Sequence, residues 1–361
     1  MSNQHRASQS ASGAQGFFRE YRDAIETRAV VIVAGVVLLG MGFVLSYVAA
    51  FHHPSPHRIP VQVAGPAQYA GRAAAGLNAV SGSPVQATVS ATPAQARSAV
   101  ISGSTTGVLV IAPSSTTDTV YVASGGGASL ATAVQDVFQA ADASQHRSTR
   151  VEDLVPLQPG DGHGLTGFYF VIGLLVTGYL AASALAVTRG ARQPTVRRTV
   201  FRLTTFIVPS IVSGLLAALI VDPLLGAVTG HFLALWGVGA LLVACAGTVT
   251  VFFQALLDTL GIGLTVILFV ILGNPSAGGA YQWPLLPTFF RVIGPALPNG
   301  AGVEAIRRIV YFGGQGITGD LLIICGYLVG ASILALVAAR LVGSGRRPAF
   351  ELPAPAAEAA L

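Results

Sequence analysis

The chain has 361 residues, of which 52% are hydrophobic and only 10% are charged. Soluble domains carry about 25% charged residues, so this composition excludes an ordinary soluble enzyme, and the high hydrophobicity excludes a disordered chain. An integral membrane protein remains. All 20 basic residues, which contribute to a net charge of +5, are arginine. Because the chain has no lysine, a Walker A nucleotide site and Schiff-base chemistry are excluded as well.

Six apolar runs approach the length of about 20 residues that crosses a hydrocarbon core of ~30 Å. The first run follows a charged leader of 28 residues and is longer than the apolar core of a signal peptide, so we interpret it as a retained anchor. The fifth run is short. The six runs are 29–51, 168–187, 205–221, 232–253, 260–272 and 321–341.

The arginines predict how these runs are oriented. Most of them lie in the N-terminal tail (1–28), between the second and third runs, and at the C-terminal end. With six spans these segments share one side, which the positive-inside rule makes cytoplasmic, so the tails 1–28 and 342–361 are expected in the cytoplasm. Three arginines in a shorter outer loop count against this orientation. The lysine-free, alanine-rich composition is typical of a high-GC bacterium and predicts a bacterial plasma membrane.

Residues 52–166 are expected to form a separate α/β domain outside the cytoplasm, before a membrane domain of five helices at 167–341. They contain no apolar run of membrane length, and their apolar residues alternate with period two in some stretches and recur at helical spacing in others. Such alternation of strands and helices indicates an α/β fold. The expected strands are 59–66, 85–91, 107–113 and 117–125, and the expected helices are 68–80, 93–101 and 129–141.

Two features of this α/β domain are candidate sites. The glycine triplet 125–127 precedes a predicted helix, which fits either an anion at the helix N-terminus or a flexible turn; no GxGxxG or P-loop pattern favours the anion. His52, His53 and His57 cluster after the first run without nearby acids or cysteines. We interpret them as polar residues at the membrane surface, and we predict no metal or cofactor site.

Residues 273–314 are too apolar and too aromatic for a solvated loop. Prolines bound two short predicted helices, 284–294 and 302–312, and broken apolar helices at membrane depth are tolerated only against protein or a cavity. We expect a re-entrant or interfacial segment that closes the outer end of a pathway; an interfacial helix pair without a transport role is the alternative. The candidate gate residues are Pro287, Phe289, Phe290, Arg291, Pro298, Arg307 and Arg308.

Contacts are expected for several of these side chains. The two adjacent phenylalanines should pack against the spans, and the arginine that follows them should face the outer surface. An arginine at the centre of a bilayer costs about 2.5–3.5 kcal/mol. One of Arg307 and Arg308 should therefore reach Glu304 or Asp320, and the other should reach the lipid headgroups.

Two features of the chain carry a resemblance to a known family. One is the order of one span, an α/β domain and five further spans, and the other is the pair of motifs SAGGAYQWPLLPTFF and PALPNGAGVEAIRRIVYF. In both features the chain resembles the YhgE/phage-infection-protein-like membrane proteins within the type-2 ABC exporter permease superfamily. The layout covers nearly the whole chain, and the specific motif covers residues 276–312. The resemblance implies a six-span permease-like fold, usually dimeric, and implies no substrate and no catalytic residue. The matching positions are Ser276, Gly278 and Gly279, Leu286 and Pro287 with Phe289 and Phe290, Pro295 with Leu297 and Pro298, Ala305 with Arg307, and the strand IPVQVAGP.

The sequence predicts a permease-like exporter subunit rather than an enzyme, because it has no GxSxG, HExxH or CxxC motif. A separate ATP-binding-cassette ATPase would supply energy, and the arginines of the loop 188–204, Arg192, Arg197 and Arg198 among them, are the candidate coupling site. The expected partners are the lipid bilayer, a second copy in a homodimer and that ATPase, but no nucleic acid, because the arginines form no single stripe. The alternative is a surface scaffold or receptor that binds an envelope component, a protein or a phage.

The predicted orientation can be tested by cysteine labelling in intact cells. A membrane-impermeant thiol reagent should label Ser114→Cys, in the outer domain, and should not label Thr195→Cys, in the arginine-rich loop. Labelling of both positions, or of Thr195→Cys alone, would overturn the orientation.

Overall fold

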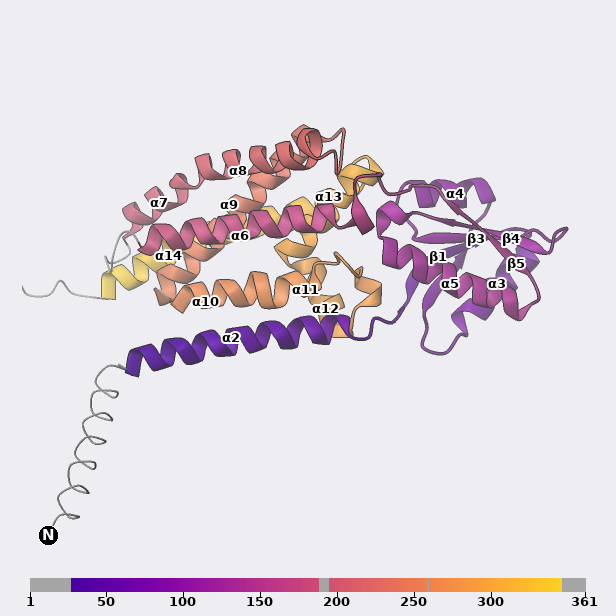
Figure 1. Ribbon diagram of the computed structural model, residues 1–361, viewed down its shortest axis with the longest axis horizontal. Coiled ribbons are helices and arrows are strands. Elements are labelled where there is room, and N and C mark those ends of the chain that lie inside the picture. The colour runs from indigo at the N-terminus through magenta and orange to yellow at the C-terminus, as the bar shows by residue number, and fades with distance from the viewer. Residues whose placement is uncertain (1–26, 188–194, 259, 346–361) are drawn as a thin grey trace, which may run out of the picture.

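The computed structural model describes residues 27–187, 195–258 and 260–345, which form a large helical domain and a smaller domain built on a β-sheet (Figure 1). The sheet domain (residues 59–153) lies at one end of the helical domain and is inserted between its first two long helices, α2 (Thr27–Phe51) and α6 (Thr166–Val187).

The sheet has five strands in the order β2-β1-β3-β4-β5. Strands β1, β2 and β3 are mutually parallel, β4 runs antiparallel to β3, and β5 is parallel to β4. The strands are β1 (Ile59–Ala64), β2 (Val85–Val89), β3 (Gly107–Val110), β4 (Thr117–Val122) and β5 (Ser148–Asp153), and the helices between them are α3 (Ala67–Asn78), α4 (Pro93–Ile101) and α5 (Ala128–Ser144).

The predicted strands and helices of this domain are present, and one strand was not predicted. Helix α4 begins as expected, since the Thr92 hydroxyl accepts a hydrogen bond from the Gln95 amide and Pro93 occupies the first turn. Strand β5 has the sequence STRVED, which is polar on both faces because it is an edge strand with no buried residue. Hydrophobic alternation gives no signal for such a strand.

Helices cover both faces of the sheet. Helices α3 and α5 lie on one face over a core that includes Val61, Leu109 and Phe138, and α4 lies on the other face (Figure 1). Both cores take in side chains from far downstream, Leu285 on the first face and Phe312 on the second. The sheet domain is thus completed by the segment that joins it to the helical domain.

Five helices are long and apolar enough to cross a membrane, judged by length and composition within the described residues. The fourth is central, because α9 packs against α6, α8, α10 and α14 and is the most buried of the five. Glycines bring its neighbours close: a Cβ at Gly178 of α6 would lie 2.5 Å from the carbonyl oxygen of Val243. The five candidate spans are Val30–Phe51, Thr166–Ala186, Val196–Leu224, Phe232–Leu257 and Thr318–Val342.

The fifth apolar run of the sequence is a shorter and irregular helix. The helical stretch Leu260–Ser276 consists of α10 (Leu260–Val266), a π-helical turn η4 (Ile267–Gly273) and α11 (Asn274–Ser276). It is too short to count among the long apolar helices, so the described residues hold five candidate spans and one shorter apolar helix. The remaining helices of the bundle are α7 (Val196–Thr205), α8 (Ile207–Leu219), the π-helical turn η3 (Ile220–Leu224), α9 (Phe232–Leu257) and α14 (Thr318–Gly345).

Candidate functional site

The segment 274–312, here called the junction segment, packs against both domains and holds most of the predicted site residues. After α11 it forms the short 3-10 turn η5 (Trp283–Leu285), α12 (Thr288–Ile293), the turn η6 (Gly294–Ala296) and α13 (Pro298–Phe312). A proline lies at or next to the start of each of these turns and helices. The sequence predicted helices at 284–294 and 302–312, whereas α12 begins only at Thr288 and α13 already at Pro298, a residue expected to stop a helix. Helix α13 is almost wholly buried between α6, α9 and α14.

The junction segment caps a helix of the sheet domain. Helix α5 begins at Gly127, which has no side chain to accept a bond from the first-turn amides. The side-chain oxygen of Gln282 takes this role and accepts a hydrogen bond from the Leu130 amide at 3.1 Å, while the Ser129 hydroxyl donates to the Ala280 carbonyl at 2.8 Å. Gln282 is only 6% exposed, so the contact is shielded from water.

The glycine triplet allows this contact, and this corrects both sequence interpretations. Gly127 has φ 137°, and a Cβ there would lie 2.2 Å from the side-chain carbon of Gln282. A Cβ at Gly125 would lie 2.5 Å from the Tyr311 ring. The triplet is therefore neither a flexible turn nor an open anion site, because the junction segment occupies the helix N-terminus.

Tyr311 fixes the chain where it enters α6. Its hydroxyl donates to Asp161 Oδ2 at 2.5 Å and accepts from the Gln158 amide at 3.3 Å, while Asp161 Oδ1 accepts from the Thr166 amide at the start of α6. Burial first, and then the hydrogen bond to Asp161, raises the pKa of Tyr311 well above its usual value. The hydroxyl therefore remains a donor throughout the physiological range.

Arg307 and Arg308 form one partly buried ion cluster, which corrects the expectation that only one of them would find a carboxylate. Glu304 binds Arg307 Nη1 at 2.7 Å and Arg308 Nη2 at 3.0 Å, and Arg308 Nε lies 3.3 Å from Asp320 Oδ2 at the start of α14. The i,i+3 and i,i+4 spacings place both arginines beside Glu304. Arg307 also donates to the Gly278 carbonyl at 2.8 Å. Two carboxylates balance two guanidinium groups, so neither cation requires a headgroup.

A pair of asparagines bonds to the π-helical turn, and sequence reasoning missed both. Asn299 is fully buried, and its Nδ2 donates to the Phe269 carbonyl at 3.0 Å and to Asn274 Oδ1 at 2.7 Å. The Ser46 hydroxyl of α2 donates to the Ile271 carbonyl of the same turn. These side chains give two carbonyls of the π-helical turn hydrogen-bond donors from other helices. Polar residues inside an apolar stretch were the available signal.

The other predicted gate residues lie around α12. Pro287 precedes the first residue of α12, and Pro298 is buried in the first turn of α13. Phe290 is 6% exposed and packs beside Ala50 at the end of α2, as expected, whereas Phe289 is 57% exposed. The expectation that Phe289 also packs against the spans is wrong, because consecutive residues of a short helix point about 100° apart and only one can face the core.

The remaining predicted arginines lie apart from this cluster. Arg291 is half-buried, and its guanidinium donates to the Thr288 hydroxyl on the same short helix. Arg197 and Arg198 lie on α7, a helical extension of the third span, so the expected loop is helical from Val196 onward. Arg197 stacks over the Phe201 ring at 5.5 Å. Arg192 lies outside the described residues.

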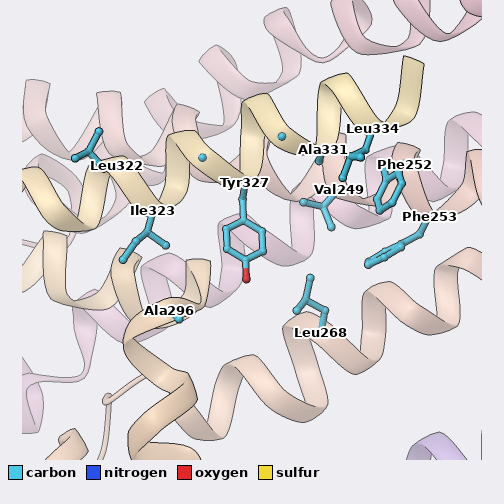
Figure 2. A pocket seen from close by; sticks show the side chains of 12 residues that line it. Val249, Phe252, Phe253, Leu268, Ala296, Leu322, Ile323, Tyr327, Ala331 and Leu334 are labelled. Atoms are coloured by element: carbon cyan, nitrogen blue, oxygen red, sulfur yellow. The ribbon is translucent and has the colours of Figure 1, made fainter. Parts of the chain in front are cut away.

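An apolar cavity of about 520 Å³ lies beside the junction segment (Figure 2). Its walls come from α9, α14, the π-helical turn and Ala296 of η6. The Tyr327 ring extends into it with the hydroxyl at its tip, as Figure 2 shows. Gly326 and Gly330 of α14 leave it open, since a Cβ at either position would meet no atom within 4 Å. Its apolar walls suit an apolar molecule with at most one hydrogen-bonding group.

Metal chemistry has no visible basis in the described ranges, where no three His, Cys, Asp or Glu side chains are grouped as metal ligands. Of the clustered histidines, His52 places Nδ1 2.8 Å from the Val48 carbonyl at the end of α2. Cys245 and Cys325 are free thiols, one of them buried in α9.

No protein-family profile, no curated protein and no solved structure matches the chain. The resemblance to the YhgE/phage-infection-protein-like proteins therefore stays a prediction from the motif at 276–312.

The capping contact predicts a measurable change in α5. Replacing Gln282 with leucine removes the acceptor of the Leu130 amide, and loss of an N-terminal cap costs about 1 kcal/mol. Hydrogen exchange in the first turn of α5 should therefore be roughly fivefold faster in Q282L. Gln68→Leu, on the exposed side of α3, is the control and should leave that exchange unchanged. Equal exchange in Q282L and the wild type would contradict the capping role.

Proposed function

We propose that the protein is a membrane permease subunit of the exporter type, with no nucleotide site of its own. The observation that carries the proposal is the apolar cavity beside the junction segment, bounded by α9, α14 and the broken helix. We propose that this cavity receives a lipophilic substrate and that the junction segment closes its outer end. The single Tyr327 hydroxyl would orient one polar group of that substrate.

The broken helix supports a transport role over a merely interfacial one. Discontinuous helices with non-helical or π-helical backbone are common at the substrate sites of transporters, where their polar groups meet protein or a cavity. Here the π-helical turn forms one cavity wall through Leu268 and is held from behind by Asn299 and Ser46. A change in this turn would alter the shape of the cavity.

The proposal includes a topology. The helical stretch Leu260–Ser276 serves as the sixth span, both tails lie in the cytoplasm, and the sheet domain lies outside a bacterial plasma membrane. Support comes from the arginine distribution and from the position of α7, whose Arg197 and Arg198 are at the opposite end of the long helices from the sheet domain (Figure 1).

The proposed energy source is a separate ATP-binding-cassette ATPase, since a chain without lysine cannot form a Walker A loop. We propose that it contacts the arginine-rich region around α7, where Arg198 is exposed. A homodimer of this chain, which the motif resemblance implies, would supply two such contacts.

Filling the cavity tests this proposal. The full-length protein, tagged and isolated from its native membrane in a mild detergent, should co-purify with an ATPase, and the complex should hydrolyse ATP. Gly330→Leu fills the cavity and should lower this hydrolysis while the ATPase still co-purifies. Gly319→Leu, at an exposed position of α14 outside the cavity, makes the same change and should leave hydrolysis at the wild-type rate.

The same purification distinguishes the exporter hypothesis from the alternative that the protein is a surface scaffold or receptor. Recovery of envelope proteins without any ATPase would contradict the exporter proposal and support the scaffold. Equal hydrolysis by G330L and G319L would show instead that the cavity takes no part in transport.

A further inference from the structure

The sheet domain contains a second cavity, a crevice of about 590 Å³ between α3 and α5. Its position follows from the strand order. The chain passes from β1 through α3 to β2 on one face of the sheet, and then from β2 through α4 to β3 on the other. The winding direction therefore reverses between β1 and β3, and ligands of open α/β sheets bind outside the carboxyl ends of the strands at such a point.

The crevice lies at that end of the sheet. It is lined by Ile111 just after β3 and by Tyr69 in the first turn of α3 after β1. Helix α5 contributes Asp142 near its C-terminus, whereas its N-terminus is capped by Gln282. A helix of 17 residues is about 25 Å long, so the crevice opens at the end of the sheet domain remote from the helical domain.

The accessible charge in the crevice is positive. Asp118 is 2% exposed, and both its oxygens are bound by Arg147, at 2.6 Å each; the buried Asp142 accepts the Thr149 hydroxyl at 2.6 Å. Arg147 is 22% exposed, and its Nη1 has no acceptor among the described residues. Arg72 is exposed on α3 and pairs with no carboxylate in the described part of the chain.

Most of the remaining wall is apolar, and Ser144 and Gln145 near the C-terminal end of α5 are its other polar residues. Leu77 of α3 and Leu109 of β3 form the floor, and the exposed Tyr69 ring stands at the rim. An apolar floor below two guanidinium groups suits a molecule with an apolar body and one anionic group, and the volume lies within the usual range for small-molecule sites. We propose that this crevice is a binding site for a small amphipathic anion, with the anionic group on Arg72 and Arg147 and the body on the apolar floor.

The site is independent of the transport proposal and can be tested with a matched set of probes. Full-length protein in phosphatidylcholine nanodiscs is dialysed to equilibrium against naphthalene-2-sulfonate, with empty nanodiscs as the reference for partitioning into lipid. 2-Naphthalenemethanol and 2-naphthylmethylammonium carry a neutral and a cationic group on the same ring. The sulfonate should bind saturably and most tightly, and the ammonium most weakly.

Two pairs of variants locate the binding. Gly76→Leu fills the crevice from α3, and Arg72→Glu reverses its accessible charge; each should raise the Kd of the sulfonate roughly tenfold or more. Gly71→Leu, at another open position of α3, and Arg97→Glu, on α4 across the sheet, should leave the Kd unchanged.

Three outcomes would overturn the proposal: no saturable binding of the sulfonate, tighter binding of the ammonium, or equal weakening by the control variants. None of these outcomes depends on an ATPase or on transport.

Discussion

The hydrogen bond from the Leu130 amide to the Gln282 side chain determines how the two domains are joined. It requires a helix whose first residue offers no cap, a glycine beside it with no Cβ, and a buried amide side chain from a segment more than 150 residues downstream. The Ser129 hydroxyl, which donates to the Ala280 carbonyl, and Leu285 in the core beneath α5 add two further contacts between this helix and the junction segment.

Several polar groups inside the helical domain have partners from other segments, as groups shielded from water require. Glu304 binds both Arg307 and Arg308, Arg308 also contacts Asp320 of α14, and Asn299 donates to the Phe269 carbonyl of the π-helical turn. Removing one partner of such a cluster is costly, because the remaining charge is buried and unpaired. Asn299 thus bonds to the irregular turn η4 and Asp320 lies in the first turn of α14, whereas Glu304 and its two arginines lie within regular α13.

Much of this architecture could be predicted from the sequence, and the exceptions have physical reasons. Apolar periodicity predicts the long helices and the inner strands, because both bury one side or all sides. It does not predict β5, whose residues face solvent, or the break at Ile267–Gly273, where the sequence remains uniformly apolar.

In the candidate site, too, some features can be predicted from the sequence and others cannot. Proline spacing predicts that this segment holds two short helices but misplaces their starts by four residues, and the partners of Gln282 and Asn299 are set by tertiary contacts that no local pattern encodes. Phe289 was expected to pack against the spans but is exposed, because an apolar side chain in an apolar segment can still face outward.

The late position of Phe312 in the chain has a consequence for synthesis. The strands of the sheet domain are complete by residue 153, yet the core beneath α4 closes only around a side chain made some 160 residues later. Until the ribosome reaches that codon, the domain carries an open apolar hollow, and any nascent-chain chaperone would meet it in that state. Recombination that exchanged residues 59–153 alone would leave the same hollow. A transfer that keeps this core complete must therefore include α13 as well.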